Sequence, residues 1–392
     1  MKAAKPDTIA THAGSSPFEQ HGMVNPPVYH ASTVLFPSLA ALEAADANPF
    51  EIYNYGRLGT PTSHAFERAI AQLEGGYRAV TVSSGLAAIT TALLAFTKAG
   101  DHVLITDSAY GPARRFANEE LTRYGVAVEY YDPLIGAGID ALIRPNTSLV
   151  YLESPGSLTF EIQDVPAIAA AAKRVGAVVV LDNTWATPLH FRPFDHGVDV
   201  SIHAATKYIV GHSDAMLGVL NCTEAAFDVV KRAAVRYGAA AGPDDIYFGL
   251  RGLRTLSVRL KRHGDSSLAL ADWLSRQPEV RHVLHPARPD HPGHHLWRRD
   301  FRGTSGLFAV LLEPFAKHAI AAMFDHFEVF GLGYSWGGFE SLALPLDPRP
   351  VRSATRWGHD GPLLRFHTGL EDIDDLIRDL DAGFGRLRQA VS

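Results

Sequence analysis

Segments with strand-like and helix-like hydrophobic patterns alternate along residues 63–222 of the chain. Short runs rich in β-branched residues predict seven strands, and most are separated by segments with helical spacing of apolar residues. The predicted strands cover 79–82, 102–105, 126–131, 149–152, 177–181, 198–202 and 217–220. The predicted helices between them cover 64–74, 86–96, 113–124 and 165–175. This alternation indicates an α/β fold with a mainly parallel seven-stranded sheet and helices on both faces.

The two ends of the chain show different patterns. Glycine and proline interrupt residues 1–60, but the apolar run Val28–Phe36 is too hydrophobic for a free tail, so we expect an extended arm laid on another surface. After Gly252 a long helix is predicted, followed by short apolar runs and a terminal helix. These elements cover 255–277, 282–284, 307–312, 363–366 and 373–387. The sequence therefore predicts an arm (1–60), a large α/β domain (61–253) and a smaller α+β domain (254–392).

The composition is that of a globular protein, with 46% hydrophobic and 20% charged residues among 392. The net charge of −6, from 36 basic and 42 acidic residues, disfavours a nucleic-acid partner. The single cysteine, Cys222, excludes a disulfide within the chain and is compatible with a reducing compartment. The N-terminus shows no secretory signal, and no apolar run approaches the roughly 18 residues of a membrane span. We therefore expect a cytoplasmic protein with no membrane partner.

A lysine and an aspartate at the ends of two predicted strands carry the strongest chemical signal. Lys207 follows the strand at 198–202 beside the hydroxyl of Thr206, and Asp182 directly follows the strand at 177–181. In open α/β sheets ligands bind beyond the carboxyl ends of the strands, so both side chains belong to one expected site. Pyridoxal phosphate needs such a pair, because the lysine forms a Schiff base and the carboxylate keeps the pyridine nitrogen protonated.

Two further strand ends carry groups that suit this cofactor. Ser84, Gly85 and Leu86 follow the strand at 79–82 and open a helix, whose free N–H groups can bind a phosphate. Tyr110 follows the strand at 102–105 and offers a ring that can stack on a pyridine. Taken singly, helix capping and ordinary packing explain these residues equally well. Their occurrence together, in order along the chain, favours cofactor binding.

Two arginines and an aromatic loop extend the expected site. Arg57 lies in the arm, where its guanidinium either binds a phosphate or is simply solvated. Arg365 interrupts an apolar strand and needs a carboxylate, from the protein or from a substrate. The glycine-rich loop 333–341 either lines the same pocket or forms a surface turn. The histidines of 291–295 lie in a Pro-Gly turn without acidic or cysteine partners, so we expect no metal.

Together these residues resemble the Cys/Met-metabolism family of pyridoxal phosphate enzymes. The resemblance covers nearly the whole chain, and the segment around Lys207 is highly specific for the family. The segments that carry it are 24–29, 55–61, 84–85, 153–156, 182–185, 201–214, 244–252 and 333–341. The resemblance implies a fold-type I, transferase-like architecture, which agrees with the α/β pattern described above.

The resemblance also implies a role for each site residue. Lys207 binds the cofactor and moves protons, Asp182 pairs with the pyridine nitrogen, and Tyr110 stacks on the ring. Arg365 clamps the substrate α-carboxylate, and Tyr55 and Arg57 reach the phosphate of a neighbouring subunit. The implied catalytic residues are Lys207, Tyr110 and Tyr55. The implied cofactor contacts are Tyr55, Arg57, Gly85, Leu86, Tyr110, Asp182, Thr206 and Lys207, and the implied substrate contacts are Tyr334, Ser335, Trp336 and Arg365.

The activity implied is cleavage of L-cystathionine to homocysteine, pyruvate and ammonia by a carbon–sulfur β-lyase of methionine biosynthesis. Because Tyr55 and Arg57 would serve a neighbour, the expected assembly is a homo-oligomer with shared sites, a dimer of dimers. Tyr334 and Trp336 match the β-lyase pattern. The alternatives are a γ-acting enzyme, such as cystathionine γ-lyase or O-acylhomoserine sulfhydrylase, and a cofactor-binding regulatory protein. Arg114 and Arg115 leave recognition of the distal end of the substrate open.

Overall fold

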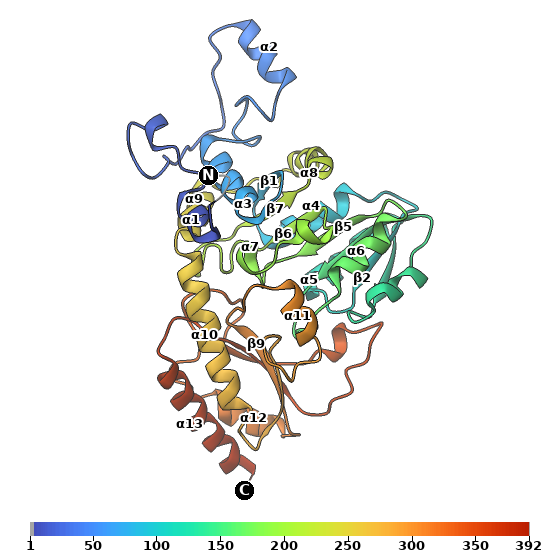
Figure 1. The fold of residues 1–392 in the computed structure, drawn as a ribbon, viewed down its shortest axis with the longest axis vertical. Coiled ribbons are helices and arrows are strands. Elements are labelled where there is room, and N and C mark those ends of the chain that lie inside the picture. The colour runs from blue at the N-terminus through green and yellow to red at the C-terminus, as the bar shows by residue number, and fades with distance from the viewer. Residues whose placement is uncertain (1–3, 392) are drawn as a thin grey trace.

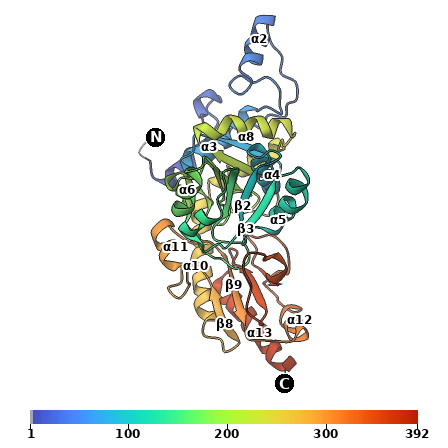
Figure 2. The same cartoon turned by 90° about the vertical axis from the view of Figure 1, so that its right-hand side faces the viewer.

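The computed structural model describes residues 4–391 and has three parts along its longest axis. The large α/β domain lies in the middle of Figure 1, with residues 6–12 of the arm beside it, the arm segment with residues 39–47 extends to the top, and the C-terminal elements are at the bottom. Figure 2 shows the same order after a quarter turn. We keep the predicted division into 1–60, 61–253 and 254–392 as our proposal.

The helices and strands match most of the predicted segments. The helices are α1 (Pro6–His12), α2 (Leu39–Ala47), α3 (Pro61–Glu74), α4 (Gly85–Ala95), α5 (Gly111–Phe116), α6 (Val165–Lys173), α7 (Thr187–His190), α8 (Glu224–Arg236), α9 (Pro243–Leu253), α10 (Leu256–Leu274), α11 (His294–Asp300), α12 (Lys317–Phe324) and α13 (Ile373–Val391). The strands are β1 (Arg78–Val82), β2 (His102–Thr106), β3 (Ala127–Tyr131), β4 (Thr147–Glu153), β5 (Val178–Asp182), β6 (Val200–His203), β7 (Gly218–Cys222), β8 (Val280–Leu284), β9 (Leu307–Leu312), β10 (Leu342–Leu346) and β11 (Leu363–His367).

The large sheet confirms the predicted seven-stranded α/β architecture. Its strand order is β1-β7-β6-β5-β4-β2-β3, and only β7 runs antiparallel to its neighbours. The carboxyl ends of β2, β4, β5 and β6 therefore meet at one edge. This edge is where Lys207 and Asp182 were expected, because each follows or ends one of these strands.

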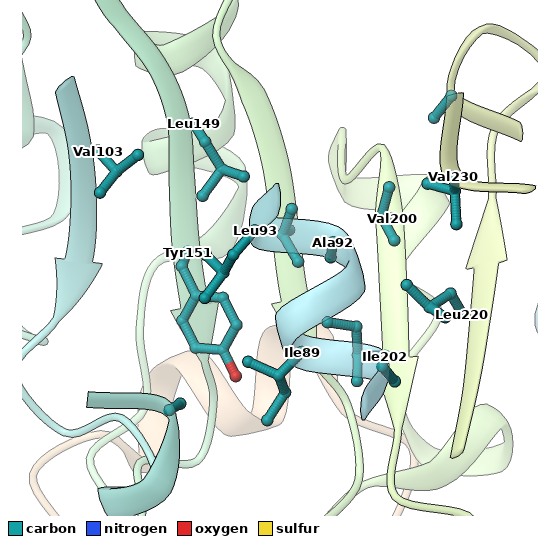
Figure 3. Close-up of a cluster of buried hydrophobic side chains, with 14 of the residues drawn as sticks. Ile89, Ala92, Leu93, Val103, Leu149, Tyr151, Val200, Ile202, Leu220 and Val230 are labelled. Atoms are coloured by element: carbon teal, nitrogen blue, oxygen red, sulfur yellow. The ribbon is translucent and has the colours of Figure 1, made fainter. Parts of the chain in front are cut away.

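The two faces of this sheet bury alternate residues of each strand, as strand geometry requires. Leu149 and Tyr151 of β4 lie beside α4 in one core (Figure 3), whereas Val150 and Leu152 lie in the other core with α6. On the first face Ile89 of α4 fits between the strands, as Figure 3 shows. Each fully buried side chain of this size contributes roughly 1.5–3 kcal/mol relative to exposure. Helices on both faces thus hold the sheet edge in place.

The C-terminal domain is built on a four-stranded antiparallel sheet with the order β10-β11-β9-β8. One face of β9 (Phe308, Val310) packs with α12 and α13, and the other face (Ala309, Leu311) joins the core of the large domain. The two domains therefore share a core. The predicted α+β character is confirmed, although the sequence pattern missed several elements of the chain, namely α1, α2, α7, α8, α9, α11, α12 and β10.

The arm projects from the large domain and carries α2 at its tip (Figure 1). Its large apolar side chains are mostly in water: Phe18 is 98% exposed and Leu35 is 88% exposed. An exposed apolar surface of this kind marks an interaction site. None of the helices in residues 4–391 is long and apolar enough to span a membrane.

Candidate active site

Lys207 lies in the turn after β6, with its side chain largely out of water. Its Nζ donates a hydrogen bond to Ser335 Oγ at 2.5 Å and lies 5.4 Å from the centre of the Trp336 ring. Burial and, to a smaller extent, the Arg365 cation lower the pKa of Lys207 to about 8, although the Asp182 carboxylate opposes them. A lysine with a lowered pKa holds more of its amine in the neutral, nucleophilic form.

Asp182 ends β5 and is 9% exposed. Its Oδ1 accepts the backbone N–H of Thr184 at 3.0 Å and the Thr184 hydroxyl at 2.5 Å. Burial raises the pKa of Asp182, although these hydrogen bonds act against it. The Thr184 hydroxyl, which donates to Asp182, also accepts the N–H of Ala204, three residues before Lys207, so Asp182 lies beside the lysine segment. A cation placed against this carboxylate would favour its ionised form.

The N-terminus of α4 forms the predicted anion-binding turn. Ser84 caps it, since its hydroxyl accepts the N–H of Ala87, and the first-turn N–H groups of Gly85 and Leu86 have no partner within the helix. A Cβ on Gly85 would lie 2.4 Å from Ala204 Cβ, so only glycine lets the turn approach the lysine segment. The Thr206 hydroxyl is held by Leu217, which both donates to it and accepts from it.

Tyr110 lies at the start of α5 and is 45% exposed. Its backbone N–H donates to Glu153 Oε2 at 2.7 Å. Glu153 pairs in register with Asp182 on the neighbouring strand, and burial together with Asp182 raises the pKa of Glu153 well above its usual range. Glu153 begins the segment 153–156 of the family resemblance, for which no site role was predicted. An acidic residue ending a buried strand was the signal available.

Arg365 on β11 reaches the same site from the C-terminal domain. Its Nη2 donates to the carbonyl oxygen of Ser335 at 3.0 Å, and burial lowers its pKa to about 10. Ser335 thus contacts both Lys207, through its hydroxyl, and Arg365, through its backbone. Tyr334 lies beside them but is 89% exposed. Lys207, Arg365 and the loop 333–341 therefore line one side of the candidate site.

Tyr55 and Arg57 are placed differently. Tyr55 pairs with Thr33 in an isolated bridge of the arm, and Arg57 Nη1 donates to the carbonyl of Val235 on α8 at 2.7 Å. Within residues 4–391 the structure shows no contact of either residue with Lys207 of the same chain. Their predicted role toward a neighbouring subunit stays a prediction.

The structure assigns Arg114 to an internal ion pair. Its guanidinium lies over the Tyr130 ring, 3.7 Å from the ring centre, and bonds Asp107 Oδ1 at 3.0 Å. Arg115 is exposed. Among residues 4–391 no group of three or more His, Cys, Asp or Glu side chains has a metal-binding arrangement.

The residues present fit pyridoxal phosphate, which carries an aldehyde, a basic ring nitrogen and a phosphate. The partly buried amine of Lys207 suits the aldehyde, and the buried carboxylate of Asp182 suits a protonated ring nitrogen. The open first turn of α4 suits the phosphate, because Gly85 leaves no Cβ above it. All three groups lie at the carboxyl edge of the large sheet.

Comparison with known proteins agrees with this fit. The family model described as "Cys/Met metabolism PLP-dependent enzyme" matches residues 7–385. Cystathionine β-lyase MetC of Escherichia coli is 45% identical over 99% of this chain and 100% of its own length. An L-alanine/L-glutamate racemase of Wolbachia pipientis is 42% identical over 98% of each chain. The crystal structure of cystathionine γ-synthase from Xanthomonas oryzae superposes with a TM-score of 0.90 at 32% identity, over 98% of this chain and 99% of the other.

Proposed function

Because the chain belongs to the Cys/Met metabolism family of pyridoxal phosphate-dependent enzymes, we propose that it is a carbon–sulfur β-lyase acting on L-cystathionine. The products would be homocysteine, pyruvate and ammonia, a step in methionine biosynthesis. The observation that carries this choice is the full-length identity to the Escherichia coli β-lyase, which exceeds that to the γ-synthase of the same fold. The racemase similarity supports amino-acid racemisation as a second candidate.

Lys207 is the proposed base. Pyridoxal phosphate, once bound, withdraws electrons from the α-carbon of an amino acid and makes the α-proton acidic. With a pKa of about 8, Nζ is partly neutral near pH 7 and can take that proton. The same nitrogen then delivers a proton to the sulfur that leaves Cβ with the electron pair of the broken bond. Ser335 Oγ orients Nζ for both transfers.

The other residues bind and orient. Arg365 would hold the substrate α-carboxylate, for which a buried guanidinium is well matched. Asp182 would hold the ring nitrogen protonated, and the first turn of α4 would bind the phosphate. Trp336, near Nζ, would shield the reacting atoms from water. Tyr55 and Arg57 would complete the site of a neighbouring subunit.

Product identification tests the function. Purified protein with pyridoxal phosphate should convert L-cystathionine into pyruvate and homocysteine, both identified by mass spectrometry. Cysteine with 2-oxobutyrate would contradict the β-lyase and support a γ-acting enzyme, whereas racemised alanine or glutamate without keto acid would support the second candidate. Lys207→Ala should abolish turnover, while the matched control Lys317→Ala, at an exposed lysine on α12, should not change it.

A further inference from the structure

The segment from Gly333 to Ser341, here called the substrate loop, must be held by its surroundings. It carries Ser335 and Trp336 against Lys207, yet it contains no helix or strand. Ser335 has a φ of +82°, which costs a residue other than glycine roughly 1–3 kcal/mol. Such a conformation persists only where neighbouring groups over-determine it, so the contacts of this loop decide where the Ser335 hydroxyl lies.

Gly337 is the point where this loop is packed against the lysine segment. It has a φ of +84°, and an added Cβ would lie 2.8 Å from Tyr208 N and 3.0 Å from Lys207 Cα. Its backbone N–H donates to His367 Nε2 at 3.1 Å, and the carbonyl oxygen of Gly338 lies 3.3 Å from the same nitrogen. One buried imidazole therefore contacts both glycines, two and three residues after Ser335.

His367 ends β11, two residues after Arg365, and is 0% exposed. Its ring lies 5.8 Å from that of Tyr208 and 5.2 Å from that of His263. Burial lowers the pKa of His367 well below its usual range, and the charges of His263, Arg365 and Lys207 act in the same direction. A neutral ring keeps one nitrogen free to accept, which the N–H of Gly337 requires.

We propose that His367 is a positioning residue, whose Nε2 accepts the Gly337 N–H and so holds Ser335 Oγ against Nζ of Lys207. The same fixation holds the Ser335 carbonyl against Arg365, because both groups belong to one residue. His367 would not touch the substrate. His367 acts through the substrate loop. The roles of Lys207 and Arg365 in this proposal rest on the proposed function.

Two substitutions of His367 distinguish an acceptor at the position of Nε2 from one at the position of Nδ1. In His367→Gln the amide oxygen reaches about as far as Nε2 and can accept the Gly337 N–H, whereas in His367→Asn it ends near the position of Nδ1. His285→Asn is the matched control, because His285 is another fully buried histidine of the C-terminal domain and bonds Ser267 away from the loop. Both His367 variants lose the same buried imidazole, so only the position of the acceptor distinguishes them, and His285→Asn measures the loss of a buried imidazole elsewhere in the domain.

Two readouts on the cofactor-free protein measure positioning directly. Hydrogen exchange of residues 331–341 should be faster in His367→Asn and close to that of the parent protein in His367→Gln and His285→Asn. The pH midpoint for acetylation of Lys207 should rise above about 8 in His367→Asn only, because the amine becomes more solvated. With cofactor and cystathionine, kcat/KM of His367→Asn should fall about 10- to 100-fold, as for a misplaced catalytic group.

The proposal is overturned if His367→Asn leaves both the loop exchange and the Lys207 midpoint unchanged. It is equally overturned if His367→Gln, His367→Asn and His285→Asn all lose loop protection to the same extent, which would indicate general loss of packing. Because these readouts use no substrate, they stand apart from the proposed function. Unexpected products with the loop effects intact would refute the β-lyase activity and leave the role of His367 supported.

Discussion

Burial shifts the pKa of four ionisable side chains of the candidate site in the direction that favours the neutral form of each. The pKa values of Lys207 and Arg365 are lowered, and those of Asp182 and Glu153 are raised. Burial penalises the charged form of any group, so these shifts have one physical origin. A bound substrate carboxylate and a protonated cofactor nitrogen would supply the counter-charges that the cofactor-free chain leaves to solvent and to its own dipoles.

The lowered pKa of Lys207 predicts a reactive amine in the cofactor-free protein. A cationic group with a depressed pKa is neutral above that value, so acetylation of Nζ should follow a midpoint near pH 8 rather than 10.5. Mass spectrometry of the Lys207 peptide across a pH series measures this, with exposed Lys317 as an internal reference. A shared midpoint for the two lysines would show that Lys207 is solvated.

At the scale of elements, the close approach of α4 to the lysine segment depends on one missing side chain. In Gly85→Ala the new Cβ would lie 2.4 Å from that of Ala204, so the turn must move away from the site. We expect cofactor affinity to fall at least about 10-fold, as when one charge-assisted hydrogen bond is lost. Gly385→Ala in α13, where a Cβ meets nothing within 4 Å, should leave that affinity unchanged. Spectrophotometric titration with pyridoxal phosphate measures both.

Asp107 and Glu161 tie the segment 349–361 to the large domain, and Glu161 does so through an ion pair with Arg352. Asp107 accepts hydrogen bonds from the N–H of Ser353 at 2.9 Å and of Thr355 at 2.8 Å, and pairs with buried Arg114. Burial raises the pKa of Asp107, but the hydrogen bonds from Thr355 and Ser353 dominate and lower it to about 2. Because this pKa lies below the ordinary 3.8, the stabilisation is complete above about pH 4 and is lost as pH falls toward 2.

Asp107→Asn should therefore leave the buried Arg114 without a counter-charge. Breaking a buried pair in this way costs about 3 kcal/mol, so the urea midpoint should fall and hydrogen exchange of 349–361 should accelerate. Asp265→Asn is the control, since its partner Lys261 is 77% exposed and the pair contributes less than about 1 kcal/mol. Equal midpoints for the two variants would mean that Asp107 does not secure this segment.

At the scale of the whole molecule, the candidate active site contains residues of both domains, and the arm suggests that a second subunit contributes as well. Lys207 and Asp182 come from the large sheet, and Arg365 and Ser335 come from the C-terminal part. The core that the two domains share at β9 fixes the position of one domain relative to the other. The arm instead exposes Phe18 and Leu35 and holds Arg57 on α8, away from Lys207. We propose that a second copy of the chain covers this surface.

Subunit mixing tests that arrangement. If Arg57 serves the site of a neighbour, Lys207→Ala and Arg57→Ala proteins should each be inactive. Each mixed dimer then has one intact site of two, so an equimolar mixture with random exchange should regain about one quarter of the parent activity. Analytical ultracentrifugation of the same samples gives the assembly size. Inactive mixtures in which exchange of subunits has been verified would refute a shared site.

Local patterning was sufficient for most of the elements and for much of the site. The seven strands and the long helix α10 follow from apolar periodicity, because burial on one or two faces must appear as a repeat in the sequence. β10 and α12 escaped prediction because they are short and pack in the core of the C-terminal domain, and the longer α8 was missed as well. Lys207, Asp182 and Gly85 were identifiable because strand ends converge in any parallel sheet.

By itself, then, the sequence determined the fold class, the family and the groups available for chemistry. Only the tertiary structure decided that Ser335 bridges Lys207 and Arg365, that Glu153 supports Tyr110, and that His367 reaches the substrate loop. The two residues of each such contact are tens to more than a hundred positions apart in the chain. Their proximity, and the pKa shifts that follow from shared burial, depend on how the two domains pack and not on any local pattern.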